Sequence, residues 1–342
     1  MNHLHNSVHG NGGMLNPQRV DTITKTLCVD TIFRKNYSTT LSTDCLFHLP
    51  EPMNNVVSIK LTALEMPNMW YRFSSADKSN QFIVHCYNVP FADPVSGDYA
   101  PYDESYLVTI PDGNYLAGEF EEILNNIFSN TSGGLAYVRY QINAYDTRSF
   151  FRASNTDDVD GLDPYVFNNV VYNAFYFTLQ FDVDGLPLSK CAGWMLGFRN
   201  PIYVANRDSQ FVDIIADDFN TLYNYIRSES SYGSSSLQYF FLELDDFQRN
   251  CVPDKVISST GTDYLGNNIL ARVTATSSHN TIVMDTGMDR IFKKRVYFGP
   301  IRLDKFHIRV FDRHGHVLNI NGNDFSFVLE VEQSWGNPQV PP

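Results

Sequence analysis

Near the carboxyl end of the chain, residues 306–311 read FHIRVF and residues 325–331 read FSFVLEV. Apolar side chains fall on alternate positions in both runs, the period of a strand that buries one face. Between the runs, Asp312-Arg313-His314-Gly315 has the composition of a turn. This stretch therefore predicts a β-hairpin, in which the two runs pair with each other.

Short runs of the same kind recur along the chain between groups of Asn, Asp, Gly, Pro and Ser, which is typical of sandwiches and barrels. The other runs that we interpret as strands are Thr24–Phe33, Cys45–His48, Val56–Leu64, Phe82–Tyr87, Tyr106–Ile110, Ala136–Ile142, Val170–Phe181, Leu237–Leu244, Ile269–Ala275 and Thr281–Met284. In the first of these, we expect Leu27, Val29, Thr31 and Phe33 on one face.

One helix is predicted in the first half of the chain, after the turn Pro111-Asp112-Gly113. Its apolar residues recur at the spacing of a single helical face, and they are Leu116, Phe120, Ile123, Leu124 and Ile127. Residues 213–227 fit either a helix or two short pieces.

These patterns predict an all-β fold: an antiparallel jelly-roll sandwich with long loop insertions and one or two short helices. We expect a flexible amino-terminal arm over residues 1–17 and one jelly-roll domain over 18–334, with an inserted loop region at about 143–169. Residues 335–342 are expected to form a carboxyl-terminal tail.

The composition excludes several functions. The chain has 342 residues and a formal charge of −13, which disfavours binding that depends on neutralising phosphates. The sequence contains no uninterrupted apolar run of about 18 residues, so no membrane span is predicted. The amino terminus lacks the pattern of a secretory signal. The five cysteines have no short pairing, which favours a reducing compartment. Because only 18% of residues are charged and 14% are aromatic, the chain is suited to large contact surfaces.

The motif most typical of an enzyme is Asp285-Thr286-Gly287, which follows the apolar run 282–284. Aspartic proteases hold a carboxylate at such a turn, but their chemistry requires two carboxylates that share a proton. The chain contains no second motif of this kind, so a protease at Asp285 is a remote alternative.

Metal sites are also disfavoured. His314 and His316 lie in the predicted turn with His307 as the nearest third candidate, and a solvated turn explains them better than a metal centre. The acidic run 157–161 fails as a calcium loop because Phe167 stands where a bidentate Glu is required. We therefore predict no catalytic, cofactor-binding or metal-binding residues, and no enzymatic activity.

A carbohydrate-binding sandwich on a particle surface is a second alternative, because aromatic side chains exposed on a β-sandwich can stack on sugars. The tyrosines that permit this interpretation are Tyr172, Tyr176, Tyr223, Tyr225 and Tyr239. The same residues also suit cross-strand pairs and subunit interfaces.

Several blocks, taken in order, resemble structural proteins of large nucleocytoplasmic double-stranded DNA viruses. They run from about residue 22 to residue 332 and cover nearly the whole chain. The blocks are TKTL (24–27), VDTIFRKNY (29–37), STD (42–44), LP (49–50), VVSIKLTALEMP (56–67), IPDGNY (110–115), GWMLGFR (193–199), YFGP (297–300) and DFSFVLE (324–330).

The resemblance implies a non-enzymatic, jelly-roll capsid component of an icosahedral giant virus, either a minor capsid protein or the penton at five-fold vertices. It implies a place in the virion, assembly in the host cytoplasm, and contacts with the major capsid protein, minor capsid proteins or further copies in a pentamer. Trp70, Tyr71 and Trp194 lie in or beside the matching blocks, and a core position suits each of them as well as an interface position.

Overall fold

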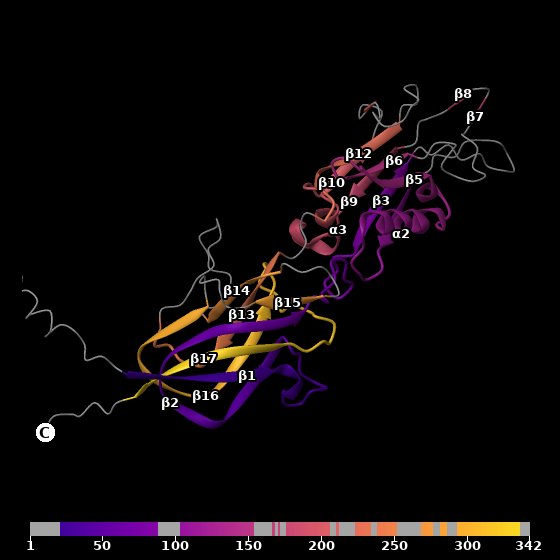
Figure 1. Cartoon of the computed structure of the whole chain (residues 1–342). Helices are drawn as coiled ribbons and strands as arrows, with labels where there is room; N and C mark the ends of the chain where they lie inside the picture. The colour runs from indigo at the N-terminus through magenta and orange to yellow at the C-terminus, as the bar shows by residue number, and fades with distance from the viewer. Residues whose placement is uncertain are drawn as a thin grey trace, which may run out of the picture. The chain divides into compact units, whose positions relative to one another are not determined.

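The chain forms two compact units, residues 1–70 with 237–342 and residues 71–236 (Figure 1). The computed structural model describes residues 21–87, 103–153, 166–167, 170–171, 176–205, 210–211, 223–233, 238–251, 268–275, 281–285 and 293–335. The sequence predicted a single domain over 18–334, whereas each unit has a buried apolar cluster of its own. The predicted arm at 1–17 and residues 336–342 of the predicted tail lie outside the described residues.

The first unit is built from antiparallel strands in the order β1-β17-β2-β16-β13-β14, with β15 also paired to β2. The strands are β1 (Asp21–Asp30), β2 (Asp44–Pro67), β13 (Tyr239–Asp245), β14 (Ile269–Thr274), β15 (Ile282–Asp285), β16 (Lys294–Phe311) and β17 (Ser326–Trp335). A 3-10 turn, η1 (Thr31–Phe33), follows β1.

Two of these strands are long and change register where they pair with each other. β2 has 24 residues and β16 has 18. Residues 305–309 of β16 pair with 44–48 of β2, residues 294–296 pair with 58–60, and the register shifts between these two regions. Pro50, Pro52 and Pro300 lie in the interrupted part. Proline has no N–H to give to a ladder, so it marks the place where a strand bulges or bends.

The shift divides the strands into two layers, because β2 and β16 contribute to both. β17 pairs with β2 only at positions 56–65, and β13 pairs with β16 only at 307–311. One layer therefore contains β1, β17 and the carboxyl-terminal part of β2 with the amino-terminal part of β16. The other layer contains the amino-terminal part of β2, the carboxyl-terminal part of β16, and β13 and β14. β15 joins the first of these layers, because it pairs with residues 64–67 of β2. Two antiparallel layers around one core confirm the predicted jelly-roll sandwich.

The predicted hairpin of residues 306–331 is wrong, although both of its strands exist. Phe306, Ile308 and Val310 are buried as the alternation predicted, and so are Phe327 and Leu329. However, β2 lies between β16 and β17, and the local turn closes instead through a bridge between Phe311 and Val317. Alternation specifies which side chains are buried, but it does not specify which strand is the hydrogen-bonded neighbour in the sheet.

The second unit has two four-stranded antiparallel sheets, β10-β9-β3-β4 and β11-β12-β6-β5, and a two-stranded sheet, β7-β8. Its strands are β3 (Gln81–Tyr87), β4 (Asp103–Thr109), β5 (Val138–Ile142), β6 (Arg148–Ala153), β7 (Val166–Phe167), β8 (Val170–Val171), β9 (Tyr176–Gln180), β10 (Ile202–Ala205), β11 (Gln210–Phe211) and β12 (Tyr223–Ser231). The helices are α2 (Ala117–Ser129) and α3 (Ala192–Met195), with 3-10 turns η2 (Gly134–Tyr137), η4 (Val183–Gly185) and η5 (Leu188–Lys190).

The predicted helix at 116–127 is confirmed as α2, which buries Phe120, Leu124 and Phe128. Of the two alternatives for 213–227, a single helix is wrong at 223–227, where β12 forms. Residues 213–222 lie outside the described residues. The expected loop at 143–169 is wrong at 148–153, because β6 pairs there with both β5 and β12. The polar composition of residues 143–169 did not indicate β6, which forms because it pairs with β5 and β12.

Two glycines explain why the block GWMLGFR must keep its small residues. A Cβ on Gly193 would lie 2.3 Å from Cγ of the buried Phe181 ring. Gly197 has φ +96°, and a Cβ there would lie 2.0 Å from the carbonyl oxygen of Ser230. The close approach at one position and the left-handed backbone at the other both require glycine.

A buried ion pair joins β16 to the segment that follows β13. Arg295 Nη1 lies 2.9 Å from Asp246 Oδ2, and the two side chains are 6% and 0% exposed. Arg295 also donates to the carbonyl oxygens of Leu244 and Asn268, both at 2.8 Å, while the Tyr297 hydroxyl donates to Asp246. Burial, followed by the charge of Asp246, raises the pKa of Tyr297. Two donors, the Arg295 guanidinium and the Tyr297 hydroxyl, therefore meet at the same carboxylate oxygen of Asp246.

Replacing Asp246 with Ala is expected to lower the unfolding free energy of the first unit by about 3–5 kcal/mol, because it leaves a buried guanidinium without its counter-charge. Chemical denaturation followed by fluorescence measures the change. Lys294→Ala is the matched control, since its pair with Glu332 is partly exposed and should cost under about 1 kcal/mol. Equal losses in the two variants would show that Asp246 has no special role.

The cysteines differ in exposure, which gives a second test of the fold. Cys28 is exposed, whereas Cys45, Cys86 and Cys191 are buried. Burial raises the pKa of Cys45 and Cys86 to about 12 and that of Cys191 to about 11. Because the thiolate is the reactive form, these three thiols are shielded twice, by burial and by protonation.

A thiol reagent at pH 8 is therefore expected to modify Cys28 rapidly in the folded chain and the three buried cysteines only after unfolding. With the half-buried Cys251 replaced by Ser in both proteins, Cys28→Ser should remove the fast phase. Above pH 9 the unfolded chain loses thiol protons that the folded chain retains, so the unfolding free energy should fall as the pH rises toward 12. Fast labelling of Cys45 or Cys86 in the folded state would contradict the packing described above.

Candidate functional site

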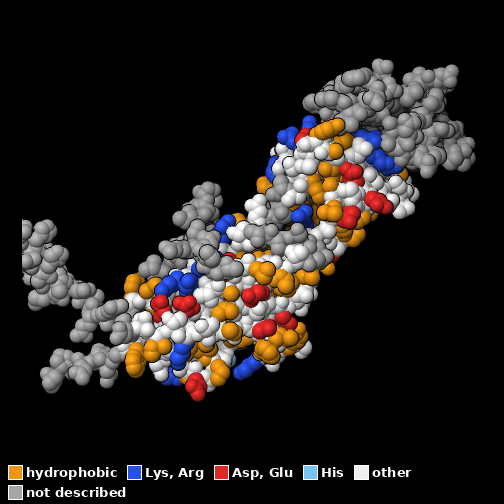
Figure 2. Space-filling model, viewed as in Figure 1, with side chains coloured by type: hydrophobic (Ala, Val, Ile, Leu, Met, Phe, Trp, Pro, Cys, Tyr) orange, Lys and Arg blue, Asp and Glu red, His pale blue; other side chains and the backbone are white. Residues whose placement is uncertain are grey.

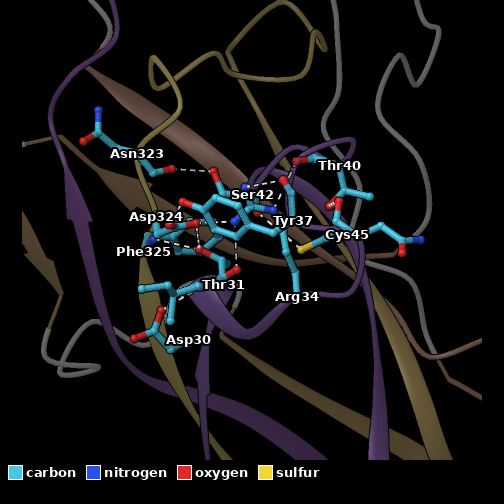
Figure 3. Close-up of polar contacts among 12 residues, drawn as sticks. Asp30, Thr31, Arg34, Tyr37, Thr40, Ser42, Cys45, Asn323, Asp324 and Phe325 are labelled. Carbon is cyan, nitrogen blue, oxygen red and sulfur yellow. Dashed lines mark hydrogen bonds and ion pairs between the residues drawn. The ribbon is translucent and has the colours of Figure 1, made fainter.

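The loop of residues 31–43 connects β1 to β2 and lies against residues 323–325 just before β17 (Figure 3). Asp30 begins the loop by accepting a hydrogen bond from the backbone N–H of Ile32 at 3.0 Å. Thr31 then continues the pairing of β1, because its N–H donates to the carbonyl of Phe325 at 3.0 Å. The N–H of Phe325 donates to the Thr31 hydroxyl at 2.9 Å. The loop is therefore fixed at its first turn by the strand that enters β17.

Arg34 holds the remainder of this loop from inside. Its side chain is only 5% exposed and forms an ion pair with Asp324. Its guanidinium donates to three backbone carbonyls, those of Thr31 at 2.9 Å, Thr40 at 3.1 Å and Tyr37 at 3.3 Å. One planar group thus fixes three points of the loop, which an ammonium could not do with the same geometry.

Asp324 is the second centre of this network. Its carboxylate accepts from Arg34, from the Thr31 hydroxyl at 3.1 Å and from the Tyr37 hydroxyl at 2.7 Å. The hydrogen bond to Asp324 raises the pKa of Tyr37, while the Arg34 guanidinium lies 3.9 Å from the centroid of the Tyr37 ring. Ser42 closes the far end by donating to the carbonyl of Asn323 at 2.6 Å. Both ends of the loop are consequently tied to the same short segment.

This fixed loop directs apolar side chains outward. Phe33 is 80% exposed, Leu41 60% and Ile32 51%. Figure 2 shows orange hydrophobic side chains gathered where Figure 1 places this loop. Ordering a loop at an interface normally costs free energy at the moment of binding, and the Arg34 network has already met that cost within the folded chain. The arrangement can therefore act as a docking surface for another protein.

The alternating pattern predicted a first strand from Thr24 to Phe33 and so gave no sign of this loop. That prediction is wrong beyond Asp30, where β1 ends and η1 turns the chain, so Phe33 is exposed and does not share the face of Leu27 and Val29. A basic residue directly after Ile32-Phe33 was the available indication of a turn. Its partner Asp324 lies 290 positions away, and no local pattern connects the two.

Asp285 does not have the surroundings of a protease carboxylate. Both of its oxygens accept from Lys293 Nζ, at 2.8 and 2.9 Å, and the Lys293 side chain is 3% exposed. The partner of Asp285 is thus an ammonium group, whereas a proteolytic pair needs a second carboxylate that shares its proton. Thr286 and Gly287 of the motif lie outside the described residues.

The histidines considered as metal ligands have structural partners. The backbone N–H groups of His314 and His316 both donate to Asp312 Oδ1, at 2.8 and 2.9 Å, as expected of a turn. His307 Nε2 lies 2.6 Å from Asp44 Oδ1 on the neighbouring strand. Among the described residues, no group of three or more His, Cys, Asp or Glu side chains is placed to bind a metal. The acidic run 157–161 lies outside them.

Of the five tyrosines considered for sugar binding, the structure describes the side chain of Tyr239 only. Its ring contacts Phe241 edge-on at 5.4 Å, and the guanidinium of Arg272 lies 4.0 Å from its centroid. One face of this ring is thus occupied by a cation. Nothing in this geometry favours a sugar at Tyr239.

Three aromatic residues in or beside the matching blocks have different environments. Trp70 is 7% exposed and packs in the core of the first unit, while Tyr71 is 39% exposed. Trp194 is half-buried, with the Arg199 guanidinium 4.0 Å from its ring centroid. Within the described part of the chain, no helix is long and apolar enough to cross a membrane.

Comparison with known proteins gave similarities to solved structures only. No protein-family model matches the sequence, and no curated protein matches it. The mavirus penton protein is 10% identical, with a TM-score of 0.42 over 92% of this chain and 100% of that chain. A chain in the cryo-EM structure of the Sputnik virophage is 11% identical, with a TM-score of 0.39 over 93% of this chain and 98% of that chain. At these values the similarities establish neither family nor function.

The Arg34 network predicts a local loss of order when its charge is removed. Arg34→Met should increase hydrogen exchange at the amides of Thr31, Thr39 and Thr40 and lower the unfolding free energy by about 3 kcal/mol, because Asp324 loses its counter-charge. Arg34→Lys should restore only part of the protection.

Phe33→Ser is the control for this experiment, since it changes an exposed side chain and should leave the exchange pattern intact. Mass spectrometry of exchanged peptides gives the comparison. Unchanged protection of residues 31–43 in Arg34→Met would show that the loop is held by other contacts.

Proposed function

We propose that this chain is a structural component of an icosahedral virus capsid, either a minor capsid protein or the five-fold vertex penton, and that it acts by protein–protein assembly without catalysis. The observation that carries the proposal is the 31–43 loop: a rigid loop on a jelly-roll sandwich that exposes Ile32, Phe33 and Leu41. The ordered blocks that resemble capsid proteins of large DNA viruses support the same role.

The chemistry of the loop favours a protein as its partner. Aromatic and aliphatic side chains without charge are the residues that form the centre of protein interfaces, where they are surrounded by a polar rim. Lys35 and Asp30 flank the apolar residues and are suited to that rim. A phosphate-rich partner is disfavoured by the formal charge of −13.

The fold supplies what a capsid contact requires of its scaffold. Both layers of the first unit are antiparallel and share one core, so the loops at their ends are carried on a rigid body. A subunit that repeats many times in a particle must present the same surface in every copy, and the buried Arg34 network provides that uniformity. The partners in this proposal are the major capsid protein, minor capsid proteins and further copies of the chain, assembled in the host cytoplasm into the virion.

The double variant Phe33→Ser, Leu41→Ser should be excluded from particles when it competes with the wild-type chain during assembly. Two anchors at the centre of an interface typically contribute about 2 kcal/mol or more each, so incorporation should fall at least about tenfold. Quantitative mass spectrometry of purified particles measures the ratio of the two chains.

Tyr145→Ser is the matched control, because Tyr145 is 90% exposed but belongs to the second unit. It should be incorporated as well as the wild type. Equal incorporation of the double variant would show that the loop is not the docking surface. Absence of the wild-type chain from particles would refute the proposed capsid role itself.

A further inference from the structure

β1 lies at the edge of its layer and pairs on one side only. All ten residues pair with β17 in an unbroken register, from Asp21 opposite Trp335 to Asp30 opposite Ser326. No described segment pairs with the other side of β1. A ten-residue strand without a bulge is long for an edge, since strands in globular proteins most often have about five or six residues.

The direction of each backbone amide follows from one hydrogen bond. The N–H of Thr31, the next position after the last paired residue of β1, donates to the carbonyl of Phe325. Because backbone groups alternate in direction along a strand, the odd-numbered residues of β1 face β17. The N–H and C=O groups of the even-numbered residues Thr22, Thr24, Thr26 and Cys28 therefore face the unpaired side.

This side lacks the features that usually prevent strand addition. Residues 22–29 contain no proline and a single charge, Lys25. The side chains of residues 22–26 are all exposed, so no described segment covers them. Natural edge strands are normally short, bulged, interrupted by proline or rich in charge. An edge of this length that no described segment covers is suited to pairing with another strand.

We propose that the partner is β1 of a second copy of this chain, which pairs antiparallel across a two-fold axis. The sequence of the edge is complementary to itself. With Thr24 opposite Thr24, Thr22 lies opposite Thr26 and Ile23 lies opposite Lys25, so threonines pair with threonines and the two lysines are apart. A register centred on Lys25 would place like charges opposite each other and is disfavoured.

The contact is distinct from the docking surface of the 31–43 loop. It uses backbone groups of β1, whereas the loop uses the apolar side chains of Ile32, Phe33 and Leu41. It is isologous, because the same edge is used by both copies, and it joins copies in pairs. The inference goes beyond the proposed capsid role and does not depend on it.

Thr24→Pro in the full-length chain tests the proposal. It removes an N–H that faces the unpaired side and none that faces β17, so each copy should stay folded while the dimer weakens. Losing hydrogen bonds at the two-fold axis should raise the dimer dissociation constant about 10- to 100-fold, as measured by analytical ultracentrifugation. Thr24→Val retains the N–H and the β-branched shape, and it should dimerise as the wild type does.

Site-resolved hydrogen exchange provides a second measurement. On dimerisation the amides of Thr22, Thr24 and Thr26 should gain protection, while the amides of Ile23, Lys25 and Leu27 should be protected in both states. A monomeric wild type at its highest soluble concentration would overturn the proposal, as would a dimer that Thr24→Pro leaves intact. A dimer lost in Phe33→Ser but retained in Thr24→Pro would assign the contact to the loop and also overturn it.

Discussion

β2 and β16 must bend together, and the first unit depends on that constraint. The two strands pair along most of their length, so a bend in one without the other would break the ladder between them. Prolines interrupt both strands in the same part of the register. Because the strands bend in step, each contributes to both layers, and the inner faces of both layers fill one core. Phe306 and Ile308 lie on one side of the bend, and Ile59 and Leu61 on the other.

The bend also explains where the 31–43 loop can be anchored. β2 begins at Asp44, directly after the loop, and β17 begins at Ser326, directly after Asp324. The loop therefore closes only when strands from opposite ends of the chain have met in the sandwich. Arg34 and Asp324 stabilise that meeting point from inside, and the apolar side chains of Ile32, Phe33 and Leu41 face outward from it. The two proposed contacts use different parts of one unit, side chains at the loop and backbone groups at β1.

Local pattern was sufficient for the fold class and for most elements. The spacing of Phe120 and Leu124 identified α2, and alternation identified the buried faces of β16 and β17. The pattern did not identify which strands are neighbours in the sheet. It paired β16 with β17 because they follow each other in sequence, and it divided β2 at its prolines into two strands. Both errors concern a bend and a pairing that only the complete sheet specifies.

The site was less predictable than the fold for the same reason. Arg34 and Asp324 are ordinary charged residues in their local sequence. Their structural role comes from the ion pair between them, and the two residues are 290 positions apart. The residues that local motifs singled out, Asp285 among them, serve instead in ion pairs and turns. The proposed docking surface consists of exposed apolar side chains, and their exposure depends on where β1 ends.

The most direct test of the capsid role is the number of copies of this chain in purified virus particles. Quantitative mass spectrometry with cryo-EM of the same particles gives both the count and the location. The account predicts a fixed stoichiometry, either five copies at each vertex or a larger count spread over the lattice, with the 31–43 loop buried against a neighbouring protein. Absence of the chain from the particles, or a variable trace amount, would contradict the account.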